Sequence, residues 1–477
     1  MGIPGADGAQ TNAGAVTVIR GGRNGLRGSG SRLWTQNTKG VPGAAIQGAA
    51  MGSALAAGDL NGDGFSDLAI GVPKDRVAGN DRAGSVIVLY GSSRGLRHSG
   101  NDRWTQDSTG VQGVAARDNR FGSALASGDF NGDGFGDLAI GAPDQQVRGR
   151  FSAGSVTVLY GSPGGLTALR DQVFTQETSG IGGSAGDLHL FGWSLAASDL
   201  GRGGADDLAI GTPLDSVEGV SQAGSVVVLY GSALDGLRAG PSQRWSQDSF
   251  KVIDRSETDD LFGWSLAAAN LGRSDTSDLA IGVPGEDLAL STDAGAVNVL
   301  FGGSKGLSAG GNQFRTQNSN GIAGQAASGD AFGSSLAAAD FGLSAFADLA
   351  IGVPGEDLAA VPGAGAINVI YGSTRGLIPR GNQLWTRNRQ GMQGSAQDGE
   401  GFGSALSGAQ YGHFGRADLA VGVERHDIAS IRGAGAVAVI YGSVDGLRPG
   451  GNQLWTRQSG GIPGTAHRGD HFGHAVA

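Results

Sequence analysis

A fixed internal period constrains the fold of this chain more than any other feature of its sequence. A Phe-Gly pair recurs at Phe121, Phe191, Phe262, Phe332, Phe402 and Phe472, and Met51-Gly52 takes the first place in the series. Successive members are 70 or 71 residues apart. Such a period indicates a repeat architecture, in which each unit buries its apolar surface against its neighbours.

Each unit has the pattern of four short strands. In the second unit the apolar runs are SALAS, DLAIGAP, GSVTVLYGS and QVFTQ, with Gly-rich gaps between them. Alternating β-branched and aromatic residues favour strands, and no run keeps the apolar stripe of a helix. Four strands in each of about seven units predict an all-β fold, a seven-bladed β-propeller whose blades are four-stranded antiparallel sheets.

The two ends of the sequence predict how the ring closes. Residues 1–50 have the pattern of the end of one unit, and HFGHAVA at 471–477 has that of the start of another. We therefore expect one propeller over residues 1–477, its last blade closed by N- and C-terminal strands that cover an otherwise exposed sheet edge. The expected blades are 51–120, 121–190, 191–261, 262–331, 332–401 and 402–471, with a closing blade from 472–477 and 1–50.

The closing blade lacks an acidic loop and most of a second strand at both ends of the chain. Either this blade has three strands, or the natural chain continues beyond Ala477. We favour the second alternative because Ala477 falls within an expected strand.

Composition and charge restrict the class of partner. The 91 glycines follow no three-residue period, so they suit tight turns and close packing rather than a collagen-like fibre. The net charge of −10, with no long run of Lys or Arg, makes nucleic acid and anionic membrane poor partners. No apolar run is long enough to span a bilayer, no signal peptide is recognisable, and cysteine is absent.

Two acidic loops carry the clearest chemical signal, DLNGDGFSD at 59–67 and DFNGDGFGD at 129–137. Side-chain oxygens stand at loop positions 1, 3, 5 and 9, and position 7 offers a carbonyl; the candidate metal ligands are Asp59, Asn61, Asp63, Phe65, Asp67, Asp129, Asn131, Asp133, Phe135 and Asp137. This all-oxygen set predicts Ca²⁺. The alternative is a polar turn, but three carboxylates within one short loop repel one another unless a cation binds.

The corresponding loops 199–207, 270–278, 340–348 and 410–418 have lost most of these donors. We expect them to hold no metal. The position-9 Asp persists in all of them, as Asp207, Asp278, Asp348 and Asp418, which predicts that it bonds neighbouring backbone amides.

The Phe-Gly pairs, the acidic loops and the Gly-x-Pro strand ends together resemble the FG-GAP repeat family. The Pro residues of these strand ends are Pro73, Pro143, Pro213, Pro284 and Pro354, and Gly422-Val423-Glu424 departs from the pattern. The family includes the seven-bladed propeller head of integrin α subunits and many bacterial secreted or surface proteins. The resemblance covers essentially the whole chain and implies Ca²⁺-binding loops and a place outside the cell; the regular, Gly-rich repeats look bacterial.

Strand order predicts two unlike faces. Antiparallel neighbours place the connections between strands one and two, and between three and four, on one face. The longer connections, such as PKDRVAGNDRAG after Val72 and KVIDRSETDD at 251–260, fall on the other. Long polar loops on a rigid scaffold are where binding usually resides, so we expect the partner on this long-loop face.

Aromatic residues recur once per unit in the fourth strand and leave two interpretations open. The series is Trp34, Trp104, Phe174, Trp245, Arg315, Trp385 and Trp455. These rings could line one sugar site per blade, as in a lectin, or pack at the blade edges, which we favour because their period is that of the fold. We expect Trp193 and Trp264, which follow Phe-Gly pairs, to pack between blades near the axis.

Two further clusters suggest chemistry only weakly. His467, His471 and His474 lie close to Asp470, but strand alternation would place His471 and His474 on opposite faces, so we expect no metal site there. The acidic pairs that begin at Glu286 and Glu356 repeat, which favours a scaffold turn over acid–base catalysis. No hydrolase elbow, phosphate loop or HExxH motif is present, so we predict no catalytic residues and no enzyme activity.

The sequence therefore predicts a monomeric, non-catalytic, calcium-stabilised recognition or adhesion propeller, secreted or on the cell surface. Its partner is expected to be a protein or carbohydrate ligand of unknown identity, without membrane insertion. The alternatives are a propeller lectin and the accessory domain of a secreted hydrolase.

Overall fold

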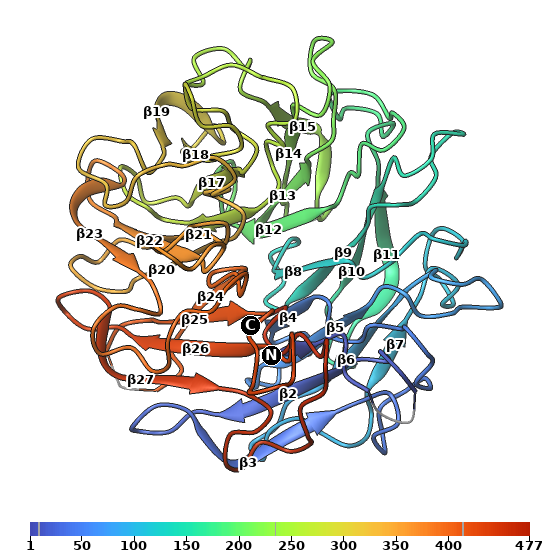
Figure 1. Cartoon of the computed structure of the whole chain (residues 1–477). Coiled ribbons are helices and arrows are strands. Elements are labelled where there is room, and N and C mark those ends of the chain that lie inside the picture. The colour runs from blue at the N-terminus through green and yellow to red at the C-terminus, as the bar shows by residue number, and fades with distance from the viewer. Residues whose placement is uncertain (8–9, 234, 413–414) are drawn as a thin grey trace.

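The computed structural model describes residues 1–477 except 8–9, 234 and 413–414. It forms seven antiparallel sheets arranged as blades around a central axis (Figure 1). The described residues contain no helix that is long and apolar enough to cross a membrane. The predicted fold class, an all-β seven-bladed propeller, is confirmed.

Six blades have four strands each, numbered in chain order from the axis outward. Blade 1 comprises β4 (Leu55–Gly58), β5 (Asp67–Val72), β6 (Ser85–Leu89) and β7 (Asp102–Trp104). Blade 2 comprises β8 (Ala124–Gly128), β9 (Asp137–Ala142), β10 (Ser155–Tyr160) and β11 (Thr167–Phe174). Blade 3 comprises β12 (Ser194–Ser198), β13 (Asp207–Thr212), β14 (Ser225–Tyr230) and β15 (Arg238–Trp245).

The remaining blades repeat this order. Blade 4 comprises β16 (Leu266–Ala269), β17 (Asp278–Val283), β18 (Ala296–Phe301) and β19 (Ser308–Arg315). Blade 5 comprises β20 (Leu336–Ala339), β21 (Asp348–Val353), β22 (Ala366–Tyr371) and β23 (Ile378–Trp385). Blade 6 comprises β24 (Ala405–Ala409), β25 (Asp418–Val423), β26 (Ala436–Tyr441) and β27 (Arg448–Trp455).

Blade 7 closes the ring with both ends of the chain. Its sheet holds β1 (Gly2–Ile3), β2 (Ala15–Arg20) and β3 (Arg27–Trp34). The C-terminal segment lies beside β1, because Gly2 N donates to Ala475 O at 2.7 Å and Gly473 N donates to Gly2 O at 3.0 Å. The two ends consequently lie together near the axis (Figure 1).

The middle strands of each blade are buried on both faces because neighbouring blades cover them. All six residues of β9 and of β10 are buried, and so are those of their equivalents in blades 3 to 6. This explains why these runs are nearly continuous in apolar residues rather than alternating with charge.

The Phe-Gly pair joins neighbouring blades. Phe121 is fully buried, and its N–H donates to Ala83 O of the preceding blade at 2.9 Å. Gly122 then packs against that blade so closely that a Cβ atom on Gly71 would lie 2.1 Å from Gly122 O. Only glycine allows the two backbones to approach in this way, which is the physical reason for the paired motifs.

A tyrosine at the end of the third strand forms a second contact between blades. Its hydroxyl oxygen accepts the N–H of a leucine in the next blade; the pairs are Tyr90–Leu166 at 3.0 Å, Tyr160–Leu237 at 3.3 Å, Tyr230–Leu307 at 3.0 Å, Tyr371–Leu447 at 3.1 Å and Tyr441–Leu26 at 2.9 Å. Blade 4 has Phe301 at this position. Burial raises the pKa of Tyr230 to about 12, so the hydroxyl stays protonated.

The aromatic residues mostly pack as part of the scaffold. Trp34 and Trp385 are fully buried and Trp455 is 8% exposed, which leaves little ring surface for a sugar. The rings of Trp193 and Trp264 lie 4.8 Å apart at the starts of adjacent blades, so these residues contact each other between blades as expected.

Candidate functional site

The first acidic loop draws its side-chain oxygens around a single turn. Asp59 Oδ1 and Asn61 Oδ1 both accept the N–H of Asp63, each at 3.1 Å, so positions 1 and 3 converge. Asp59 Oδ2 accepts Gly64 N–H at 2.8 Å, and Asp63 Oδ1 accepts Phe65 N–H at 3.0 Å. Positions 1, 3 and 5 therefore surround the same few amides.

The second loop repeats this arrangement. Asp129 Oδ1 and Asn131 Oδ1 each accept Asp133 N–H at 3.0 Å, and Asp133 Oδ1 accepts the N–H of Phe135 at 2.9 Å. Gly134 N–H donates to Asp129 Oδ2 at 2.9 Å. The two loops thus place their equivalent residues alike.

Position 9 has a different environment. Asp67 is buried; its Oδ2 accepts Leu60 N–H at 2.9 Å and its Oδ1 accepts Gly91 N–H at 2.7 Å. The carboxylate therefore ties the loop to the end of the third strand. Five equivalents make the same two kinds of bond, namely Asp137, Asp207, Asp278, Asp348 and Asp418. The predicted amide-bonding role of this residue is confirmed.

The ligand chemistry of the two loops suits Ca²⁺, but only some of the predicted ligand positions have oxygens free to bind it. Positions 1, 3 and 5 provide converging oxygens of the kind a hard cation prefers. Both oxygens of Asp67 and of Asp137 already face backbone amides, and Arg97 pairs with Asp63 Oδ2. Among the described residues, no three His, Asp or Glu side chains are grouped as a ready-made metal site.

The later loops use their remaining polar groups locally. Asp199 and Asn270, at position 1, accept N–H bonds from Gly201 at 2.9 Å and Gly272 at 3.0 Å. In the fifth loop the guanidinium of Arg416, from the next blade, bonds Asp340 and also donates to Ser344 O at 2.7 Å. A fixed side-chain cation therefore lies beside position 1 of this loop. In the sixth loop, 410–418, His413 and Phe414 lie outside the described residues.

The acidic loops also connect the blades through their backbones. The carbonyl of position 1 accepts the N–H of position 8 in the next blade; these bonds join Asp59 to Gly136, Asp129 to Asp206, Asp199 to Ser277, Asn270 to Ala347 and Asp340 to Ala417, at 2.8 to 2.9 Å. Each of these acidic loops is thereby hydrogen-bonded to the loop of the following blade.

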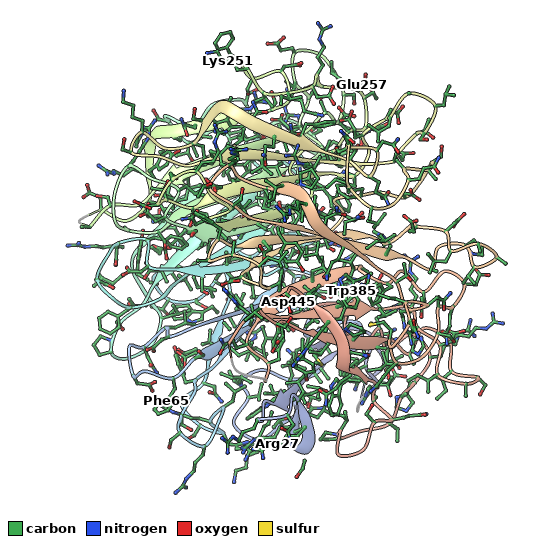
Figure 2. All side chains as sticks on the ribbon, turned by 90° about the vertical axis from the view of Figure 1, so that its left-hand side faces the viewer. Arg27, Phe65, Lys251, Glu257, Trp385 and Asp445 are labelled. Carbon is green, nitrogen blue, oxygen red and sulfur yellow. The ribbon has the colours of Figure 1, made fainter. Side chains whose placement is uncertain are left out.

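The opposite face carries the long connections. Figure 2 shows Phe65, of the first acidic loop, toward the left of the view and Glu257, of the connection between blades 3 and 4, toward the right. Lys251 and Glu257 stand exposed on loops that project from the body (Figure 2).

A buried polar network on this side joins each blade to the next, and sequence reasoning missed it. Gln106, two residues after Trp104, donates to Gln145 Oε1 of blade 2 at 2.6 Å and accepts from Asn119 Nδ2 at 2.8 Å. The equivalent contacts include Gln36–Asp75, Gln176–Asp215, Gln247–Glu286, Gln317–Glu356 and Arg387–His426. Alignment of the units with one another would have revealed these positions.

The interfaces differ in how their charge is balanced. Arg387 pairs with Glu400 at 2.5 Å between blades 5 and 6, and Arg457 pairs with Asp470 at 2.8 Å at the next interface. At the interface of blades 3 and 4, Asp260 and Glu286 are both buried and no described Lys, Arg or His bonds either one. Burial, aided by the neighbouring carboxyl of Asp254, raises the pKa of Glu286 to about 9.

These contacts account for the acidic pairs at Glu286 and Glu356. Both glutamates accept a hydrogen bond from a glutamine of the preceding blade, at 2.7 Å and 2.6 Å. They lie within the packing of the ring, as a scaffold role requires.

A depression of 540 Å³ lies on the long-loop face where the ring closes. Its lining includes Lys74, Glu424, His471 and His474, from blades 1, 6 and 7. His474 Nδ1 donates to Glu424 Oε2 at 2.7 Å. Burial would raise the pKa of Glu424, but the hydrogen bond and charge of His474, with the nearby His471 and Arg425, hold this pKa below its usual range.

The expectation that His471 and His474 face opposite ways is wrong. Both line this depression, because His471 adopts a left-handed backbone with φ of 55° and the segment around it is not a regular strand. Asp470 is turned away from them and buried against Arg457.

The fold and the two complete acidic loops define this chain as a seven-bladed β-propeller with acidic-loop repeats in blades 1 and 2. It carries FG-GAP repeats: the FG-GAP repeat model matches residues 51–89 and 121–159, the two units that hold the complete acidic loops.

Curated relatives match part of the chain. A phosphatidylinositol-glycan-specific phospholipase D of Bos taurus is 34% identical over 166 residues, which are 35% of this chain and 19% of the relative. Integrin alpha-PS2 of Drosophila melanogaster is 36% identical over 166 residues, 34% of this chain and 11% of the relative. The matches therefore span about a fifth of these relatives or less.

Among solved structures, the exotype rhamnogalacturonan lyase YesX matches with a TM-score of 0.37 and 13% identity, covering 84% of this chain and 56% of that one. Similarity at this level carries no argument about function.

Proposed function

We propose that this propeller is a non-catalytic recognition module that acts outside the cell and binds a protein or glycan partner through its long-loop face. The observation that carries the proposal is the structural difference between the two faces of the propeller. The acidic and short loops on one face bond to one another around the ring, while the long polar connections project from the other. A rigid scaffold with projecting loops is the usual arrangement for recognition.

The relatives support a place outside the cell. The integrin α subunits and the phosphatidylinositol-glycan-specific phospholipase D are extracellular or secreted proteins. The aligned region covers only a small part of each, so activity and partners of those proteins do not transfer with it.

Calcium at the two complete loops would order blades 1 and 2. Asp59, Asn61 and Asp63, with Asp129, Asn131 and Asp133, are the residues that would hold it, and the ion would neutralise their crowded carboxylates. Extracellular modules of this kind bind Ca²⁺ in roughly the 10⁻⁴–10⁻³ M range, which suits a protein outside the cell.

Single cysteine labels test which face binds, since the chain has no cysteine of its own. Glu257 lies on a long connection and Asp445 on the short turn between β26 and β27, which strand order places on the other face. Both residues are exposed, so Glu257→Cys and Asp445→Cys can be labelled; Figure 2 labels both residues. Each is coupled to a polyethylene glycol maleimide and used to capture partners from the native surroundings with and without Ca²⁺.

We expect the label at position 257 to abolish capture and the label at 445 to leave it intact. Loss with the 445 label alone would place recognition on the acidic-loop face and refute the proposal.

A further inference from the structure

The depression at the ring closure gathers residues that depart from the repeat. Glu424 stands where the six other units have proline, and His474 where the others have serine or tryptophan. Six other units build the same turn without a histidine or glutamate at these two positions, so the fold does not require them. Departures gathered in one cavity, rather than scattered, point to a ligand.

The nitrogen atoms around this cavity have spare hydrogen-bonding capacity. The carboxylate of Glu424 is already paired with His474 Nδ1 at 2.7 Å, which leaves the Nε2 atom of His474 without a partner among the described residues. His471 Nδ1 is buried and unpaired, and the ammonium of Lys74 bonds no described residue. One paired acid lies beside three nitrogen groups that bond no described residue, of which His471 Nδ1 is buried and Lys74 and His474 face solvent, and this favours an anionic group as occupant.

A second depression, of 580 Å³, continues from the first, because Gly48 and Lys74 line both. Its other lining side chains include Arg76, Arg82, Arg117 and Asp81. Asp81 is paired with Arg76 at 2.5 Å, and Asp118 is paired with both Arg82 and Arg117. The joined depressions, which we call the basic groove, still hold more cations than carboxylates on a chain whose net charge is −10. An extended ligand with several negative charges would match this length and sign.

The lining favours a carbohydrate over a peptide. Peptide recognition usually relies on apolar anchor pockets or an open sheet edge, and the described lining offers only a few small apolar groups such as Pro4, Ala50 and Ile46. Gly5, Gly48 and Gly469 also line the cavity, but their backbone N–H groups already donate within the chain, so a ligand would meet carbonyl oxygens, which accept hydrogen bonds from sugar hydroxyl groups.

We propose that the basic groove binds an acidic glycan, whose carboxylate or sulfate groups are held by Lys74, His471 and His474. This inference rests on the proposed function and names the class of ligand for part of the long-loop face. The site is distinct from the acidic loops, so it requires no metal.

Isothermal titration calorimetry of the whole chain tests this proposal with defined probes. The probes are a hyaluronan tetrasaccharide as the acidic glycan, chitotetraose as a neutral glycan of similar length, and tetraglutamate as an acidic peptide. The variants are Lys74→Ala, His474→Gln and Lys251→Ala. Lys251→Ala is the control, because Lys251 is exposed and lies outside the groove, and its replacement removes the same charge as Lys74→Ala (Figure 2). Melting curves establish that each variant is folded.

We expect the acidic tetrasaccharide to bind and the neutral one not to. Loss of one charge-assisted hydrogen bond should weaken binding about tenfold in Lys74→Ala and His474→Gln, with Lys251→Ala unchanged. Equal weakening by Lys74→Ala and Lys251→Ala, equal binding of both sugars, or tighter binding of tetraglutamate would each overturn the proposal. The cysteine-label result at position 257 does not depend on these outcomes, so the two proposals fail separately.

Discussion

Gln247 Nε2 donates a 2.7 Å hydrogen bond to Glu286 Oε2 of the next blade, and Asp260, buried at the same interface, is bonded by no described cationic side chain. At the equivalent position between blades 5 and 6, Arg387 bonds both Glu400 and His426. The propeller therefore contains two equivalent blade interfaces, one with a buried arginine and one without.

The first prediction concerns pH. Burial, together with the neighbouring carboxyl groups of Asp254 and Asp260, raises the pKa of Glu286 to about 9. Burial raises the pKa of Asp260 to about 7. Both values exceed those of the unfolded chain, so the folded protein retains protons that the unfolded chain releases. Stability present at acidic pH should thus be lost as pH rises through these values, and the melting temperature should fall between about pH 6 and about pH 9.

The matched variants are Gln247→Arg, which copies Arg387, and Gln106→Arg. At the second interface, Gln145 and Asn119 stand where Glu286 and Asp260 stand at the first. Gln247→Arg should make the fall in melting temperature shallower and Gln106→Arg should not. Part of the slope should remain, because burial also raises the pKa values of Asp137, Asp207 and Asp278 to about 7 and that of Asp348 to about 8. A wild-type profile that is already flat would contradict the assignment.

The second prediction concerns calcium. Chelation should lower the melting temperature, because removing the cation leaves the carboxylates of 59–67 and 129–137 to repel one another. Asp133→Ala should reproduce part of the loss and reduce the effect of the chelator. Asp199→Ala, in a loop without the full donor set, should leave the chelator effect at its wild-type size. Identical melts with and without chelator would rule out the metal.

The third prediction concerns the tyrosine contacts between blades. Tyr230→Phe removes one of the two acceptors of Leu307 N–H, which also bonds Gln243 Oε1 at 3.1 Å, and should cost about 1 kcal/mol of unfolding free energy. Phe301, at the same position in blade 4, shows that the site accepts a phenylalanine ring. Denaturant unfolding of this single variant gives the value, and no change would mean that the bond from Leu307 N–H to Gln243 Oε1 is sufficient by itself.

The fourth prediction concerns close backbone packing. Gly71→Ala places a Cβ atom 2.1 Å from Gly122 O, so a blade must shift, and we expect a loss of about 3 kcal/mol. Gly240→Ala is the control, because a Cβ atom there meets nothing within 4 Å. Thermal unfolding of the two variants side by side separates backbone crowding from a general effect of replacing glycine.

The sequence predicted well those features that repeat within one unit. Strands follow from local alternation, and the convergence of Asp59, Asn61 and Asp63 follows from loop spacing. The network of Gln106 and Gln145 escaped because its partners are 39 residues apart and neither is charged. His471 and His474 were misplaced because strand alternation was extended into a segment whose backbone turns at His471.

The pairing of Gly2 with Ala475 has a consequence for engineering. Since the ends lie side by side, a short peptide linking them would add little strain, and the polypeptide could be reopened at any exposed connection between blades. Such circular permutants should retain the same strand topology, with the new N- and C-termini in a different blade.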